Sequence, residues 1–173
     1  YIGWQRQENG PSIQQALEEA ITAFCSETVR VHGAGRTDAR VHAFGQVAHF
    51  DIEKETTPDT VRDAINAHLG ASSISILNVL AVSDEFHARI SARERVYLYR
   101  ILNRRPAPTL DESRVWHVPW ELDAGAMHVA AQGLVGTHDF TTFRSTMCQA
   151  KSPIKTLDQI SIKESDYPGG IEV

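Results

Sequence analysis

The residues with the clearest chemical potential lie in residues 33–50, which read GAGRTDARVHAFGQVAHF. Gly33 and Gly35 permit backbone conformations that other residues resist, and the succession Arg36, Thr37 and Asp38 follows them. A carboxylate on such a loop, between two apolar segments expected to be strands, has a rigid base and can still face a substrate. Such a carboxylate is a candidate functional group. The structural alternative is a surface turn in which Asp38 bonds its own backbone.

Positive charge is concentrated in one part of the chain although the net charge is −5. Residues 86–116 hold seven arginines against three acids, whereas residues 51–85 hold seven acids against two basic residues. The seven arginines are Arg89, Arg93, Arg95, Arg100, Arg104, Arg105 and Arg114. Phosphate binding requires a basic face rather than a basic protein, and the planar guanidinium suits phosphates and bases. The pattern fits a nucleic-acid surface, with a merely solvated arginine-rich face as the alternative.

Length and composition set the class of protein. With 173 residues, 42% of them hydrophobic, the chain can bury one good core or two small ones. No apolar run approaches the length of a membrane span, and the first residues lack the layout of a signal peptide. Cys25 and Cys148 are too few for a disulfide framework. These features predict a cytoplasmic protein.

Three helices are expected to carry the fold. Ser12 and Gln15 have the spacing of a capping box, and apolar residues follow at helical spacing to Phe24. Thr57 and Pro58 open a second helix that Gly70 ends, with His68 as a helix-end residue rather than a ligand. Asp123 caps a third helix, which runs to about Leu134.

Strands are expected between and after these helices. Their predicted ranges are residues 29–31, 46–50, 74–82, 95–101 and 156–163, with another strand after residues 169–170. Residues 137–144 are predicted to form a polar-aromatic loop. In the strand over residues 95–101, alternation places Arg95, Tyr97 and Tyr99 on one face, which suits base stacking and phosphate contact as well as plain core packing. The order of elements predicts an α+β fold with antiparallel sheets and helices on one side.

The loop around Asp38 closely resembles the catalytic loop of the TruA family of tRNA pseudouridine synthases, whose signature reads GRTDxGVHA followed by GQVxHF. Other segments resemble the family in the same order: GWQRQ at residues 3–7, FHAR at 86–89, RVYLYRI at 95–101, HDFTTF at 138–143 and CQAKSP at 148–153. The resemblance implies two related α+β halves, residues 1–86 with the catalytic loop and residues 87–173. Their antiparallel sheets, covered by helices, would join across a central basic cleft, in a homodimer that grips tRNA.

The resemblance also implies an activity: isomerisation of uridine to pseudouridine at positions 38 to 40 of the tRNA anticodon arm. It assigns the catalytic role to Asp38 and the stacking partner of a flipped base to Tyr97. Arg36 is expected to take a phosphate or help expel the base, and Arg89, Arg95 and Arg144 are expected to contact RNA. Neither a metal nor a cofactor is expected.

The chain departs from the family pattern at Arg40, where the family has glycine. A glycine at that position suggests a backbone with positive φ or one too crowded for a side chain. Arginine there raises a second possibility for the function: a catalytically impaired, TruA-like tRNA-binding protein. The family also continues beyond Val173 to an arginine expected to pair with Asp38. We therefore interpret the chain as an internal fragment without the N-terminal strand and the C-terminal segment, inactive by itself. A metal hydrolase using His32, Asp38, His42 and His49 is a more distant alternative, since no recognised ligand motif is present.

Overall fold

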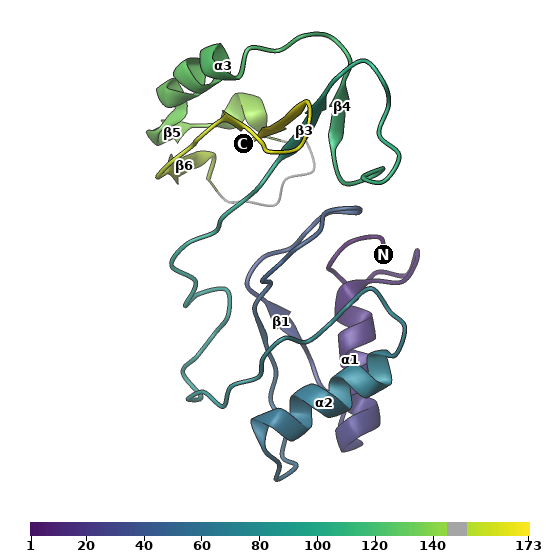
Figure 1. Ribbon diagram of the computed structural model, residues 1–173. Coiled ribbons are helices and arrows are strands. Elements are labelled where there is room, and N and C mark those ends of the chain that lie inside the picture. The colour runs from purple at the N-terminus through teal and green to yellow at the C-terminus, as the bar shows by residue number, and fades with distance from the viewer. Residues whose placement is uncertain (145–151) are drawn as a thin grey trace. The chain divides into compact units, whose positions relative to one another are not determined.

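A computed structural model describes residues 1–144 and 152–173 of the chain (Figure 1). Its described part forms two compact units, one over residues 1–95 and one over residues 96–173. Each unit combines helices with small, mainly antiparallel sheets, which agrees with the α+β class. The functional division into residues 1–86 and 87–173 stays a prediction. No helix within the described ranges combines the length and the apolar character that crossing a membrane requires.

The first unit is built around two helices with confirmed caps. Helix α1 covers Ile13–Cys25, and the Ser12 hydroxyl accepts a hydrogen bond from the Gln15 N–H at 3.2 Å. Helix α2 covers Pro58–Leu69, and the Thr57 hydroxyl accepts from the Thr60 N–H at 3.3 Å. Gly70 ends α2 and His68 occupies its last turn, as predicted. The core between the helices consists of Trp4, Leu17, Ala20, Ile21, Val29, Val31, Val61 and Ile65.

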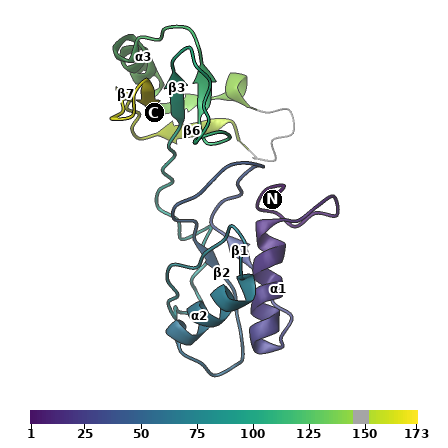
Figure 2. The same ribbon diagram turned by 45° about the vertical axis from the view of Figure 1, so that its right-hand side comes forward.

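The sheet of this unit is short. It pairs β1, His32–Gly33, with β2, Ala48–His49, in antiparallel register (Figure 2). The strand predicted over residues 29–31 is wrong, because side chains of α1 bond its backbone instead of a neighbouring strand. The Gln14 amide donates to the Val31 carbonyl at 2.9 Å, and the Val31 N–H donates to the Glu18 carboxylate at 3.2 Å.

Residues 74–82 are also predicted to be a strand. Here too, a side chain from a helix bonds the backbone in place of a neighbouring strand. The side chain of Asn66 on α2 accepts a hydrogen bond from the Ile76 N–H at 2.8 Å and donates to the Ile76 carbonyl at 2.9 Å. Ile74, Ile76 and Val79 still pack against the core. The β-branched content that predicted a strand is therefore found here in a segment that packs on the core without joining a sheet.

The second unit contains a four-stranded sheet in the order β4-β3-β8-β7. Its strands are β3 (Arg100–Asn103), β4 (Trp116–Val118), β7 (Lys163–Glu164) and β8 (Gly170–Glu172). The pairs are antiparallel except that β3 and β4 run parallel. Helix α3, Ala124–Ala131, is capped by Asp123 as predicted, and a 3₁₀ turn, η1 (Gln132–Leu134), completes it. Met127 of α3 packs on a core of Ile101, Val118 and Ile171.

The strand predicted over residues 95–101 begins only at Arg100. Backbone pairing extends outward as far as Tyr99, which exchanges two hydrogen bonds with Val173 at 2.9 and 3.0 Å. Tyr97 therefore precedes the strand rather than standing on it. A strand needs a partner as well as an alternating sequence, and β8 with Val173 supplies that partner only from Tyr99 onward.

The predicted polar-aromatic loop over residues 137–144 is partly a strand. β5, Gly136–Asp139, pairs antiparallel with β6, Ile154–Leu157, and η2, Thr141–Phe143, is a 3₁₀ turn. The single strand predicted over residues 156–163 is divided between β6 and β7, whereas the strand after residues 169–170 is confirmed as β8. Residues 148–151 of the matched CQAKSP segment lie outside the described residues.

Candidate active site

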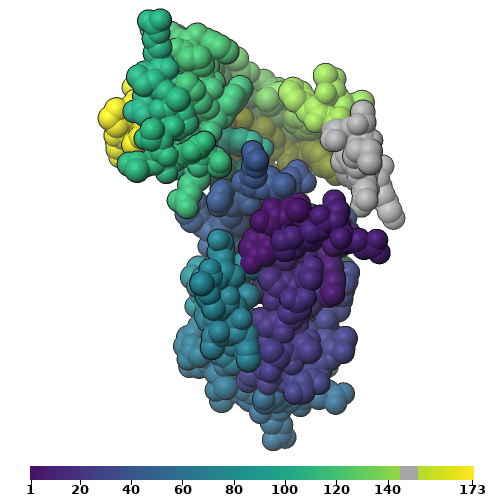
Figure 3. All heavy atoms as spheres, turned by 90° about the vertical axis from the view of Figure 1, so that its right-hand side faces the viewer, coloured from purple at the N-terminus to yellow at the C-terminus, as the bar shows by residue number. Residues whose placement is uncertain are grey.

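The Asp38 loop, residues 33–48, connects β1 to β2 and exposes the carboxylate. Its backbone is held by residues 1–11, here called the N-terminal segment, which precede the cap of α1. Figure 3 shows this segment in dark purple at the end of α1. Gly3 and Asp38 form an antiparallel bridge, and the Trp4 N–H donates to the Thr37 carbonyl at 2.9 Å. Within the loop, the Val41 N–H donates to the Asp38 carbonyl at 3.2 Å. The backbone around Asp38 is thus fixed while the carboxylate remains free to face a substrate.

Helix α1 in turn holds the N-terminal segment. The first N–H groups of a helix lack partners within the helix and need other acceptors. The Ile13 N–H donates to the Gly3 carbonyl at 3.1 Å, and the Gln14 N–H donates to the Trp4 carbonyl at 2.9 Å. The position of Asp38 is therefore linked through Gly3 and Trp4 to the start of α1, one face of which is buried.

Two glycines permit the close approach of these segments. Gly3 has φ +125°, and a Cβ there would lie 2.9 Å from the Thr37 carbonyl oxygen. A Cβ on Gly33 would lie 2.6 Å from Cε2 of the buried Trp4 indole. Both distances are shorter than a real Cβ contact, so a larger residue would push the Asp38 loop away from its support.

Arg40 adopts φ +67°, the left-handed conformation that the family glycine suggested. Arginine at this position therefore has a φ in the range that favours glycine. The cost of this conformation in an L-residue is about 1–2 kcal/mol, which a folded unit can absorb.

The two ends of the loop are held together by hydrogen bonds within the loop and by one side chain from outside it, Arg95. The Ala34 N–H donates to the Val47 carbonyl at 2.8 Å, and the Gln46 amide donates to the Gly35 carbonyl at 2.8 Å. One guanidinium nitrogen of Arg95 donates to the Ala34 carbonyl at 3.1 Å and to the Arg89 carbonyl at 3.4 Å. Arg95, expected to contact RNA, thus also braces the loop that carries Asp38.

Three histidines gather at the base of the loop, a grouping that was not predicted from the sequence, in which His87 was noted only within the FHAR segment. His32 and His49 face each other across β1 and β2 with ring centroids 5.1 Å apart, and His87 lies 4.6 Å from His49. Burial lowers the pKa of His49, His87 and His32 lower it further, and Asp51 and a backbone hydrogen bond with His32 oppose the shift. His42, named with His32 and His49 in the metal alternative, is not part of this group.

The metal-hydrolase alternative gains no support from the side-chain geometry. Within residues 1–144 and 152–173, no three or more His, Cys, Asp and Glu side chains are grouped so that they could hold a metal ion.

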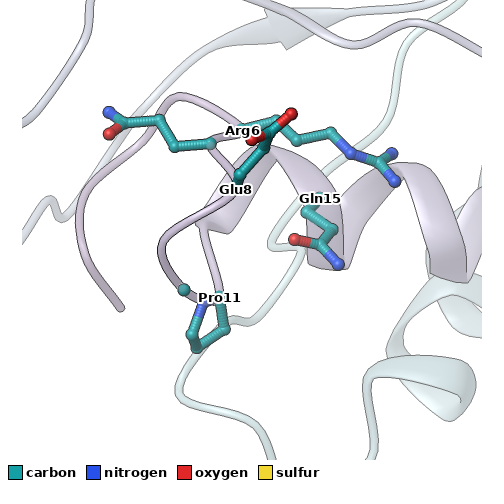
Figure 4. A pocket seen from close by; sticks show the side chains of 6 residues that line it. Arg6, Glu8, Pro11 and Gln15 are labelled. Atoms are coloured by element: carbon teal, nitrogen blue, oxygen red, sulfur yellow. The ribbon is translucent and has the colours of Figure 1, made fainter.

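The other predicted site residues belong to different parts of the molecule. Arg36 and Arg89 are exposed residues of the first unit. Tyr97, 68% exposed, and Arg144, which follows η2, belong to the second unit. A cavity of about 490 Å³ lies beside the N-terminal segment and is lined by Arg6, Gln7, Glu8, Gly10, Pro11 and Gln15 (Figure 4). Asp38 does not line it.

Known proteins are similar to this chain over most of its length. A model of the tRNA pseudouridine synthase family matches residues 1–90 and 130–171. The chain is 56% identical over 173 residues to a tRNA pseudouridine synthase A of Parvibaculum lavamentivorans, covering all of this chain and 70% of that protein. It is 59% identical over 162 residues to the proteins of that name from Nitrobacter winogradskyi and Bradyrhizobium sp.. Those matches cover 94% of this chain and 64% and 66% of the two relatives, so the chain spans about two thirds of the proteins it matches.

Proposed function

The chain belongs to the tRNA pseudouridine synthase family, and we propose that it isomerises uridine to pseudouridine in tRNA with Asp38 as nucleophile. The observation that carries the proposal is the exposed carboxylate of Asp38 on a backbone fixed by Gly3 and Trp4. Such a group can approach a substrate without a reorganisation of the loop. The names of the relatives, each called a tRNA pseudouridine synthase A, support tRNA as the substrate.

The chemistry matches the residues of the loop. The N1–C1′ bond of uridine breaks, the detached uracil rotates, and a bond forms between C5 and C1′. C5 loses a proton and N1 gains one, so substrate and product are isomers and the reaction balances without a cofactor. A carboxylate oxygen of Asp38 supports this sequence by forming a transient bond to the sugar carbon C1′ or to C6 of the base.

The target uridine must leave its stack before the carboxylate can reach it, which costs a few kcal/mol. We assign the stacking partner of the flipped base to Tyr97, whose ring is exposed. We propose that four arginines contact RNA phosphates or the base: Arg36, Arg89, Arg95 and Arg144. The proposed targets are positions 38 to 40 of the anticodon arm, and the acting species is a cytoplasmic homodimer.

The conformation of Arg40 favours the catalytic assignment over an impaired tRNA-binding protein. Its φ of +67° keeps the backbone shape that glycine would supply. Asp38, two residues earlier, is still held through Gly3 and the Trp4 N–H.

The test replaces Asp38 by Asn in the complete protein, with Asp84→Asn as the control at another exposed aspartate of the first unit. Release of tritium from tRNA labelled at uridine C5 follows the lost proton directly. Asp38→Asn should abolish release and leave the Kd for tRNA within a few fold, because the amide keeps the shape and loses the nucleophile. Asp84→Asn should behave like the unaltered protein. Activity above a few per cent in Asp38→Asn would contradict the assignment.

A further inference from the structure

The rings of His32, His49 and His87, here called the histidine cluster, join three segments at the base of the Asp38 loop. His32 lies on β1, just before the loop, and His49 on β2 is its register partner. Figure 2 shows these two strands. Their rings stack with an interplanar angle of 21°, and His87 lies 5.9 Å from His32 and 4.6 Å from His49. The rings of Phe86 and His49 lie nearly perpendicular, with their centroids 6.1 Å apart.

One hydrogen bond defines the protonation state of His49. The Ala88 N–H donates to Nδ1 of His49 at 3.2 Å, so this nitrogen is an acceptor and carries no proton. Protonation of Nδ1 would turn it into a second donor facing the Ala88 N–H, and the bond would be lost. Ala88 is buried, so water replaces that bond poorly.

The hydrogen bond to His49 connects residues 86–95 with the Asp38 loop, and a second connection runs through Arg95. Residues 86–89 are fastened to β2 through His49, and Arg95 joins the Arg89 carbonyl to the Ala34 carbonyl at the loop's start. Both ends of the Asp38 loop are therefore tied to residues 86–95. Loss of the His49 bond would release one of the two ties.

The charges around His49 favour its neutral form. The titratable groups that act on it are His32 on β1, His87 in residues 86–89 and Asp51 just after β2. A proton on His49 is disfavoured by His87 and His32, and Asp51 offsets this only in part. Burial, His87 and His32 together lower the pKa of His49. As the pH falls through about 6.5, the ordinary pKa of histidine, His49 takes up a proton in the unfolded chain before it does so in the folded protein. Folding stability is therefore lost as the pH falls.

We propose that His49 is a positioning residue for Asp38: its neutral ring holds residues 86–89 against the loop base through the Ala88 N–H, and protonation of His49 breaks this bond, releases the loop and lowers turnover. This inference rests on the proposed function, because it assigns the residue that places the nucleophile. It predicts an acid limb in the pH profile of turnover that depends on the imidazole of His49.

The test uses the complete protein with three variants. His49→Asn retains an acceptor near the position of Nδ1 and does not titrate, His49→Ala removes the acceptor, and His68→Asn changes a histidine in the last turn of α2 as the control. Two experiments are run between pH 5 and 8. One measures kcat and KM on tRNA, and the other measures the hydrogen-exchange protection of residues 33–48 and 86–89 without tRNA. Protection is expressed relative to intrinsic exchange, which itself varies with pH.

We expect His49→Ala to lower kcat about fivefold to tenfold, the change that corresponds to one lost hydrogen bond, with little change in KM. Protection of both segments should fall with it. His49→Asn should recover most of this loss and flatten the acid limb, and His68→Asn should show the profile of the unaltered protein. Exchange is measured without substrate, so it reports on the positioning role even if the protein fails to act on tRNA. Unchanged protection in His49→Ala would overturn the positioning role, and an unchanged acid limb in His49→Asn would overturn the link to turnover.

Discussion

The Asp38 loop and the stretch that carries Tyr97 are both exposed, but the structure holds them very differently. The backbone around Asp38 is bonded to the N-terminal segment, which is bonded to the first turn of α1. Tyr97 precedes β3, and the backbone pairing of that strand extends only to Tyr99. The backbone of Asp38 is fixed by these bonds, whereas Tyr97 lies outside the backbone pairing of its strand.

This difference fits the two proposed tasks. A nucleophile that is misplaced by about 1 Å can lose about a hundredfold in rate. A stacking side chain needs only a flat ring within reach of a base, and stacking tolerates variation in geometry. We therefore expect changes to the support of Asp38 to damage turnover of bound tRNA, and changes at Tyr97 to act through the flipped base.

The largest expected effect breaks the support of the first region. Trp4 is 5% exposed and lies against Gly33, whereas Trp116 in the second unit is 69% exposed. Trp4→Ala should reduce the free energy of unfolding of its unit by about 3–5 kcal/mol, because it removes a buried aromatic ring. Trp116→Ala is the matched control and should change stability by roughly 0.5 kcal/mol or less.

Denaturant unfolding of the complete protein measures both changes. Turnover is then compared at a temperature at which Trp4→Ala is still folded, and it should be well below that of the control. Equal stability and equal turnover in the two variants would show that the N-terminal segment does not support the Asp38 loop.

A smaller effect is expected at Tyr97. Tyr97→Phe keeps the ring and removes the hydroxyl, whereas Tyr97→Ala removes both. Stacking on a base is worth about 1–3 kcal/mol, so the alanine variant should lose about tenfold or more in kcat/KM and the phenylalanine variant far less. Both variants should unfold like the unaltered protein, because the ring is exposed. Equal losses in the two variants would transfer the role from the ring to the hydroxyl.

The smallest effect sharpens the description of the loop itself. Arg40, Ser26 and Ser113 have positive φ values of 67°, 64° and 67°. Replacing Arg40 by Gly should raise the stability of its unit by about 1 kcal/mol or less, since relief of the left-handed strain is partly offset by the greater freedom of glycine in the unfolded chain. Ser26→Gly, at the C-cap of α1, is the control for the backbone effect alone.

Thermal unfolding and turnover of the Arg40→Gly variant are measured together. We expect a small rise in Tm and unchanged turnover of bound tRNA, because the backbone of Arg40 already has the glycine conformation. A large gain in turnover would mean that the arginine side chain obstructs the site.

The parts of the fold that local chemistry determines could be predicted from the sequence. Ser12, Thr57 and Asp123 cap the three helices as expected, because a capping side chain acts within three residues of itself. The positive φ of Arg40 also followed from a local comparison with the family glycine.

The parts that depend on distant partners could not be predicted. Residues 29–31 and 74–82 have strand-like sequences, but Gln14, Glu18 and Asn66 satisfy their backbone with side chains. His87 joins His32 and His49 through tertiary packing, and its position in the sequence gave no indication of this contact. The support of the loop by Arg95 is likewise a contact between residues 61 positions apart.

The most direct test of the central claim is Asp38→Glu in the complete protein, measured as single-turnover tritium release from saturating labelled tRNA. Glutamate keeps the charge and the nucleophilic oxygen but displaces the oxygen by one methylene from a backbone that cannot follow. We predict that the rate falls about a hundredfold or more while the Kd for tRNA changes little. A rate within a few fold of the unaltered protein would contradict the claim that the held loop positions Asp38 for the reaction.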